Sequence, residues 1–174
     1  MREPRHTAPA QAIPSRASTG LEIREALSAG AITECRKLFM EYQQQLGVSL
    51  CFQGFEAELA ALPGEYAPPH GRLLIAYFEG DAVGCVALRP LGNGNAEMKR
   101  LYVRLQYRGK QWGRQLAERA IAEAHSMSYR KLRLDTLPEM RSAQRLYAEL
   151  GFGEIARYND NPISGARFLE LLLT

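Results

Sequence analysis

Cysteine and histidine are scarce in this sequence, which limits the kinds of site it can build. The 174 residues include three cysteines and three histidines. Cys35, Cys51 and Cys85 lie far apart, form no C-x-x-C pair and are odd in number. They exclude a disulfide framework and favour a reducing compartment. The histidines are scattered as well, and we therefore expect no metal site.

Long apolar runs and a strong net charge are also absent. No stretch is long and apolar enough to span a bilayer, so we expect no membrane association and a cytoplasmic location. The formal net charge is +3 and no block of like charges occurs, which argues against nucleic acid as a partner. A weakly positive balance of this size suits an anionic cofactor.

The N-terminal residues 1–20 differ in composition from the rest of the chain. They are rich in Ala, Pro, Ser, Thr and Arg and lack the apolar run of a secretory signal. We predict a disordered tail here. A basic transit peptide is the alternative, which Glu3 and three prolines weaken. Residues 21–174 are predicted to form a single domain, long enough to bury a core without disulfides or metals.

Apolar periodicity and turn residues divide the domain into short elements. The predicted strands are 21–24, 72–78, 82–88, 96–103, 131–135, 153–157 and 167–173. The predicted helices are 32–46, 55–62, 143–150 and one that begins near Lys110 and continues to Ala124. Turn signals at 79–81 and 91–95 indicate that the strands from 72 to 103 form an antiparallel meander.

The middle of the chain changes the expected sheet from antiparallel to mixed. Residues 96–135 read as strand, helix and strand, which implies a parallel pair joined by a right-handed crossover. Together with the meander, this predicts an α/β (α+β) fold. We expect a mixed, mostly antiparallel central sheet of six to seven strands with helices on both faces.

The most informative segment connects the strand that ends at Val103 to the helix near Lys110. The first turn of a helix presents free backbone N–H groups and a partial positive charge. Gly109 lets the backbone approach an anion closely, while Arg108, Lys110 and Arg114 add positive charge. These features suit a pyrophosphate, although an ordinary helix start with a solvated basic turn fits the loop alone equally well. The loop is neither a Walker A loop nor a dinucleotide fingerprint.

Two longer motifs carry a family resemblance. Residues 97–103 read E-M-K-R-L-Y-V and residues 107–116 read Y-R-G-K-Q-W-G-R-Q-L; residues 143–152 read A-Q-R-L-Y-A-E-L-G-F. The first two resemble the acetyl-CoA motif of the GNAT N-acetyltransferases, and the third resembles the family pattern A-x-x-L-Y-x-x-L-G-F. Their order and spacing are those of the family, and the resemblance runs from about Leu21 to Thr174. Gln111 departs from the glycine pattern R-G-x-G-x-G, and Met140 stands where the family often has asparagine.

The resemblance implies an acetyl-CoA-dependent N-acetyltransferase that acts on a primary amine by direct attack in a ternary complex. Backbone groups at 101–103 would run beside the pantetheine arm, and one N–H would polarise the thioester carbonyl. The backbone at 108–113 would hold the pyrophosphate. The implied cofactor-binding residues are Leu101, Tyr102, Val103, Arg108, Gly109, Lys110, Gln111, Trp112, Gly113 and Arg114.

Three side chains are candidates for proton transfer. In the family pattern Tyr147 would protonate the leaving thiolate of CoA; without the pattern it reads as a core aromatic residue of its helix. Glu97 is the best candidate for a general base that takes a proton from the amine. The alternative for Glu97 is a solvated charge at a strand edge. Asp135, at the end of the next strand, is a lower-ranked base or a binding group for a cationic substrate.

The sequence does not identify the acceptor, which could be a small-molecule or a peptide amine. In this fold the acceptor pocket usually lies against the region before the sheet, and the loop 158–162 would close it; ordinary surface loops are an equal alternative. The candidate wall residues are Phe52, Gln53, Phe55, Glu56 and Tyr66. A homodimer is left open. The rival functions are a non-catalytic acyl-CoA-binding sensor and a small nucleotide-binding domain.

Overall fold

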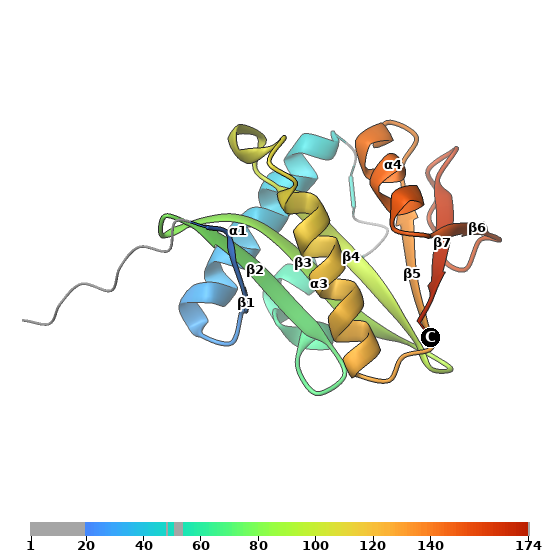
Figure 1. The fold of residues 1–174 in the computed structure, drawn as a ribbon, viewed down its shortest axis with the longest axis horizontal. Helices are drawn as coiled ribbons and strands as arrows, with labels where there is room; N and C mark the ends of the chain where they lie inside the picture. Colours follow the sequence, from blue (N-terminus) through green and yellow to red (C-terminus); the bar gives the residue numbers. More distant parts are fainter. Residues whose placement is uncertain (1–19, 48, 51–53, 174) are drawn as a thin grey trace, which may run out of the picture.

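The computed structural model describes residues 20–47, 49–50 and 54–173 (Figure 1). The tail predicted at 1–20 lies outside the described residues apart from Gly20, and so do Cys51, Phe52 and Gln53. None of the helices within the described ranges is long and apolar enough to cross a membrane.

The described residues form seven strands, four α-helices and two short 3-10 helices. The strands are β1 (Glu22–Glu25), β2 (Arg72–Phe78), β3 (Asp81–Gly92), β4 (Asn95–Val103), β5 (Lys131–Thr136), β6 (Gly153–Ile155) and β7 (Arg167–Leu172). The α-helices are α1 (Ala29–Leu46), α2 (Phe55–Ala61), α3 (Trp112–Ser126) and α4 (Arg141–Glu149); the 3-10 helices are η2 (Gly64–Tyr66) and η3 (Leu105–Tyr107).

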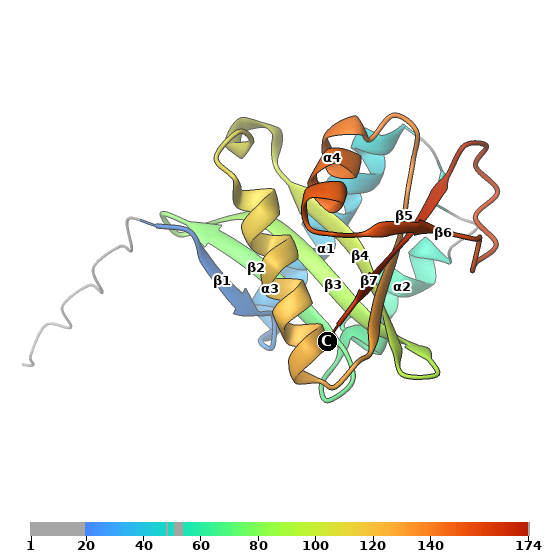
Figure 2. The ribbon, with the colours of Figure 1, turned by 45° about the vertical axis from the view of Figure 1, so that its right-hand side comes forward.

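All seven strands belong to one sheet, in the order β1-β2-β3-β4-β5-β7-β6. The pair β4–β5 is parallel, and the other neighbouring pairs are antiparallel. Because side chains alternate across a strand, the sheet has an apolar surface on each face. The helices α1 and α2 pack on one face around Phe39 and Phe55. The helix α3 lies on the other face, as the turned view in Figure 2 shows, and its residues Leu116 and Ala120 belong to the core there. The predicted mixed sheet with helices on both faces is confirmed.

Helix α3 begins at Trp112, two residues later than the sequence predicts. Gly109 (φ 79°) and Gln111 (φ 64°) both adopt the left-handed conformation, which a helix cannot contain. Gln111 therefore lies just before the helix as its N-cap residue. The first free N–H groups of α3 consequently follow Gln111 rather than Lys110.

Strands β4 and β5 stay together for only part of their length. Their parallel pairing joins Asn95–Glu97 to Lys131–Arg133, and no further pair between them occurs among the described residues. Beyond it, β4 contains a bulge: the register shifts between Cys85 and Ala87 of β3, and Arg100 lies opposite that shift with a φ of 58°. A bulge bends a strand and redirects its side chains. Figure 1 shows β4 and β5 separating toward their C-terminal ends.

Candidate active site

A cleft of about 760 Å³ opens where β4 and β5 separate. One wall consists of β4 and the loop before α3, and the other consists of α4 and the segment that leads into it. Of the ten predicted cofactor-binding residues, nine line this cleft: Leu101, Tyr102, Val103, Arg108, Gly109, Gln111, Trp112, Gly113 and Arg114. The residues of the first wall, within 101–114, and those of the second wall, within 137–149, therefore line one cavity although most of α3 and all of β5 lie between them in the sequence.

Lys110 is the predicted residue that does not line the cleft. Its ammonium nitrogen lies 4.9 Å from the ring centre of Trp112 and 5.1 Å from that of Phe78. The ring of Tyr107 is 5.9 Å away. Cation–π contacts of this kind hold the Lys110 side chain against the aromatic cluster. The positive charge of Lys110 thus anchors the loop to β2 and α3.

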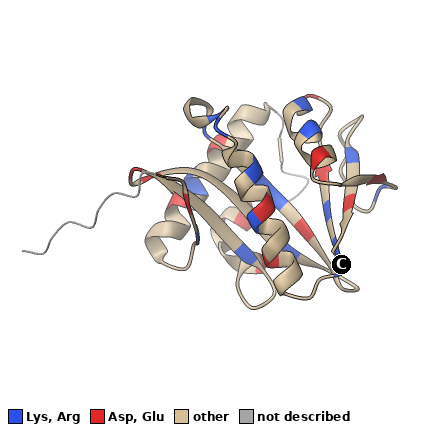
Figure 3. Cartoon of the chain, viewed as in Figure 1, with Lys and Arg blue, Asp and Glu red and all other residues tan. Residues whose placement is uncertain are grey.

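The Arg108 side chain braces the loop against the end of β4. Its Nε donates a hydrogen bond to the Val103 carbonyl at 2.9 Å, and one of its terminal nitrogens donates to Gln45 Oε1 at 2.8 Å. Arg114 forms an ion pair with Glu149 of α4, so the two walls are linked across the cleft. Figure 3 shows basic positions in the loop before α3 and on α4.

Sequence reasoning missed much of the second wall. The α1 residues Tyr42, Gln45 and Leu46 reach the cleft from the far side of β4. The segment around the start of α4 contributes Leu137, Glu139, Met140, Arg141, Ser142, Ala143, Arg145 and Leu146. A signal for it was present, because Arg141 and Arg145 have the i, i+4 spacing that puts two charges on one helix face.

A second, smaller cavity of about 40 Å³ adjoins the cleft. Five residues line both spaces: Tyr42, Leu46, Leu101, Leu137 and Met140. The small cavity also contains the candidate acid Tyr147 and the candidate base Asp135. A ligand in the cleft can therefore contact a small chemical group bound in this cavity, next to the side chains of Tyr147 and Asp135.

Tyr147 is buried, with 5% of its surface exposed. Burial, and then the neighbouring Tyr42 and Asp135, raise the pKa of Tyr147, so its phenol stays protonated over the whole physiological range. Burial also raises the pKa of Tyr42 to about 12. Two protonated phenols therefore stand near the junction of the two cavities.

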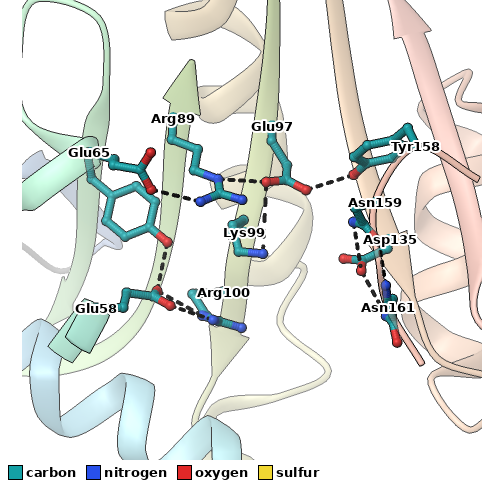
Figure 4. A network of polar contacts seen from close by, with 11 residues as sticks. Glu58, Glu65, Arg89, Glu97, Lys99, Arg100, Asp135, Tyr158, Asn159 and Asn161 are labelled. Carbon is teal, nitrogen blue, oxygen red and sulfur yellow. Dashed lines mark hydrogen bonds and ion pairs between the residues drawn. The ribbon is translucent and has the colours of Figure 1, made fainter. Parts of the chain in front are cut away.

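Glu97 is fully buried and lines neither cavity. Its Oε2 accepts a hydrogen bond from Arg89 Nε at 2.7 Å, and its Oε1 accepts one from the Tyr158 hydroxyl at 2.9 Å (Figure 4). The ammonium of Lys99 is 3.9 Å from Oε2. Both carboxylate oxygens of Glu97 thus have partners within the protein. The alternative interpretation of Glu97 as a solvated charge at a strand edge is therefore wrong.

Asp135 lies on β5 and does line the small cavity. Its Oδ2 accepts hydrogen bonds from the side-chain amides of Asn161 at 2.8 Å and Asn159 at 3.2 Å. These amides belong to the loop 158–162 that sequence analysis placed beside the acceptor pocket. The loop orients the Asp135 carboxylate, and Asn161 itself lines the cavity.

Three of the residues predicted to line the acceptor pocket, Phe55, Glu56 and Tyr66, are among the described residues, and they line neither cavity. Phe55 and Tyr66 are buried in the core beneath the sheet, and Glu56 is exposed. Leu50 lines the small cavity instead. The buried thiols do not offer an acyl-carrying nucleophile, since burial raises the pKa of Cys35 to about 12 and also raises that of Cys85.

The bulged β4 is held in place by a buried ion pair with α2. Arg100 Nε donates to Glu58 Oε1 at 3.0 Å and a terminal nitrogen donates to Oε2 at 2.5 Å. The Tyr66 hydroxyl also donates to Glu58, at 2.7 Å. Burial alone would raise the pKa of Glu58, but the hydrogen bonds and charge of Arg100 outweigh it and lower that pKa.

We expect Glu58→Gln to lower the free energy of unfolding by about 3 kcal/mol at neutral pH, because it leaves the buried Arg100 without a counter-charge. The lowered pKa means that Glu58 stabilises the fold above its unfolded pKa of about 4.3. This contribution is lost as the pH falls through the folded pKa. Urea denaturation from pH 7 to 3 measures both effects.

The control for this measurement is Glu56→Gln, which removes an exposed carboxylate from the same helix. It should change the free energy of unfolding by less than about 0.5 kcal/mol. Equal stabilities of the wild type and the Glu58 variant at pH 7 would contradict the prediction.

The model of the Acetyltransferase (GNAT) family matches residues 33–152. An uncharacterized N-acetyltransferase of Schizosaccharomyces pombe is 40% identical over 142 residues, which cover 80% of this chain and 87% of the relative.

Solved structures with a similar fold include acetyltransferases of the same family. One from Staphylococcus aureus has a TM-score of 0.75 at 22% identity, over 89% of this chain and 100% of that one. One from Elizabethkingia anophelis, determined with acetyl-CoA bound, has a TM-score of 0.53 at 25% identity, over 59% of this chain and 76% of that one.

Proposed function

The chain belongs to the GNAT family of acetyltransferases and is an acyltransferase, and from this we propose that it moves the acetyl group of acetyl-CoA to a primary amine by direct attack in a ternary complex. One observation carries the proposal. The small cavity that holds Tyr147 and Asp135 shares five residues with the large cleft, so an amine and a thioester can meet there.

Acetyl-CoA is proposed to occupy the large cleft. A relative of similar fold binds this cosubstrate. The residues of this cleft suit it, because the start of α3 offers free N–H groups to the pyrophosphate and Arg108, Arg141 and Arg145 supply positive charge on both walls, beside the Arg114–Glu149 ion pair. The pantetheine arm would run beside the backbone at 101–103, toward the small cavity.

Starting from the ammonium form of the amine, the transfer requires two protons to leave the nitrogen and one proton to reach the thiolate. We assign the first to Asp135, whose carboxylate accepts a proton from the ammonium directly or through a water molecule. The neutral nitrogen then attacks the thioester carbonyl carbon, and a backbone N–H of β4 stabilises the oxyanion of the tetrahedral intermediate. The C–S bond breaks, and the protonated phenol of Tyr147 donates its proton to the CoA thiolate. The attacking nitrogen loses its second proton to the Tyr147 phenolate, directly or through water, which leaves a neutral amide, and Asp135 returns the first proton to solvent.

Glu97 receives a positioning role in this proposal rather than that of the base. Its carboxylate binds Arg89 and Tyr158 and lies 3.9 Å from Lys99, at the point where β4 and β5 are still paired. A carboxylate held in this way orients neighbouring side chains, and Glu97 lines neither of the cavities in which the amine would lie.

The decisive experiment is an acetyl-CoA turnover screen over a panel of amines, with release of free thiol as the readout. The proposed function predicts amine-dependent thiol release and an acetylated product detectable by mass spectrometry. Stabilisation of the fold by acetyl-CoA without turnover on any amine would instead identify a binding module. Stabilisation by ATP and not by acetyl-CoA would identify a nucleotide-binding domain.

We expect Gly113→Glu to weaken acetyl-CoA binding by about 10- to 100-fold, a loss of roughly 1.4–2.8 kcal/mol. Gly113 is the second residue of α3 and lines the cleft, and an added Cβ would meet no atom closer than 4.0 Å. The new carboxylate would repel the pyrophosphate without straining the helix. Isothermal titration calorimetry measures the change in Kd.

The matched control is Gln115→Glu, which introduces the same charge two residues later on an exposed position outside the cleft. It should bind acetyl-CoA nearly as the wild type does. If the two variants have the same Kd, the pyrophosphate is not held at the start of α3.

A further inference from the structure

The large cleft carries positive charge well beyond the loop before α3. Four arginines and two glutamates line it, so positive charge is in excess on its walls. Arg114 forms an ion pair with Glu149, and Arg108 braces the loop through its hydrogen bonds. The other two arginines, Arg141 and Arg145, belong to α4 and therefore lie on the wall opposite that loop.

The guanidinium groups of Arg141 and Arg145 have no partner within the part of the chain that the structure describes. Neither side chain forms a hydrogen bond or an ion pair there, and both are exposed where α4 borders the cleft. Their i, i+4 spacing puts two like charges on one face of the helix, an arrangement that destabilises a helix. Folding alone gives no reason for this pair, whereas an anion bound to both would remove the repulsion.

The ion pair between Arg114 and Glu149 fixes where the two arginines lie relative to the start of α3. Arg114 is in the first turn of α3, and Glu149 is the last residue of α4. Arg145 precedes Glu149 by one helical turn, a rise of about 5.4 Å, and Arg141 precedes Arg145 by another. The two guanidinium groups therefore follow along α4 from the place proposed for the pyrophosphate.

Acetyl-CoA has a second anionic group close to its pyrophosphate. This group is the 3′-phosphate, a monoester on the same ribose that carries the pyrophosphate. A phosphate monoester has a charge of about −1.5 to −2 at pH 7. Arginine binds such a group through paired N–H donors, with a geometry that lysine lacks. Two guanidinium groups one helical turn apart suit the oxygens of one phosphate.

We propose that Arg141 and Arg145 bind the 3′-phosphate of acetyl-CoA, so that the enzyme selects this cosubstrate over its 3′-dephospho form. This inference rests on the proposed binding of acetyl-CoA and adds a subsite and a specificity to it. Figure 3 marks the basic positions on α4. The 3′-phosphate and the thioester are at opposite ends of the cosubstrate, so the pair contributes to binding and not to the chemical step.

The test compares acetyl-CoA with 3′-dephospho-acetyl-CoA on the wild type and on the double variant Arg141→Met/Arg145→Met. Isothermal titration calorimetry measures the two Kd values. We expect the wild type to bind acetyl-CoA at least about tenfold more tightly, because the dephospho form lacks the charge-assisted hydrogen bonds. In the double variant the ratio of the two Kd values should fall to about one.

The ratio separates specificity from damage to the fold, since both ligands are measured on the same protein. Arg119→Met, which removes an exposed arginine of α3 outside the cleft, is the matched control and should keep the wild-type ratio. In steady-state kinetics of the wild type, the two cosubstrates should differ in KM and share the same kcat, because the interaction is made equally in the ground state and the transition state.

Two results would overturn the proposal while acetyl-CoA binding stands. The wild type could bind both forms equally, or the double variant could keep the wild-type ratio. A double variant that binds both forms more weakly by the same factor belongs to the second case, because the arginines would then hold the pyrophosphate, which both forms contain.

The proposed function fails separately from this inference. Binding of acetyl-CoA without turnover on any amine overturns the acetyl transfer and leaves the 3′-phosphate site to be decided by the ratio. Absence of acetyl-CoA binding overturns both.

Discussion

Replacement of Tyr147 by phenylalanine is expected to lower kcat about 10²- to 10⁴-fold, the range typical for loss of a general acid. The phenol is protonated, buried and part of the small cavity that adjoins the cleft. Phenylalanine keeps the ring contact with Phe152, whose centroid is 5.7 Å away, so the fold should be preserved. Steady-state kinetics with thiol detection measures the effect, and calorimetry should give an unchanged Kd for acetyl-CoA.

The control is Tyr129→Phe, which removes a hydroxyl that donates to the His70 carbonyl outside both cavities. It should leave kcat unchanged. Tyr42→Phe tests the second phenol, which lines both spaces. If Tyr147→Phe keeps the wild-type kcat and Tyr42→Phe loses it, the proton donor is Tyr42 and our assignment is wrong.

Asp135→Asn is expected to lower kcat/KM at least about 10²-fold, because asparagine cannot accept the proton of the ammonium. The asparagine oxygen can still accept hydrogen bonds from Asn159 and Asn161, so the loop that borders the cavity should keep its place. Asp81→Asn, an exposed carboxylate at the start of β3, is the control. Thiol release at saturating acetyl-CoA measures the change.

Glu97→Gln distinguishes the base from the positioning residue. Loss of the Glu97 carboxylate leaves Arg89 and Lys99 without their buried counter-charge, and we expect a loss of about 3 kcal/mol in the free energy of unfolding. Where the variant remains folded, kcat/KM should fall much less than in Asp135→Asn. A variant with wild-type stability and no turnover would instead make Glu97 the base.

The elements of the fold follow from local pattern. The predicted strand at 72–78 matches β2, and Gly47 ends α1 in the left-handed conformation that glycine adopts without strain. Apolar residues that alternate along a strand, or recur with the spacing of a helix, encode these elements because each element buries one of its faces. The position where α3 begins was missed by two residues, since the left-handed backbone of Gln111 has no sequence signal comparable to a glycine.

The sequence by itself determined the family, the mixed sheet and nine of the residues that line the cleft, because the motifs at 97–116 and 143–152 encode a strand, a loop and two helices locally. Tertiary structure decided which charges face the cavity. Glu97 and Asp135 look alike in sequence, but the bulge of β4 and the separation of the two strands bury one and direct the other into the cavity. Which of the two carboxylates lines the cavity depends on the distances between strands, and no local sequence pattern contains these distances.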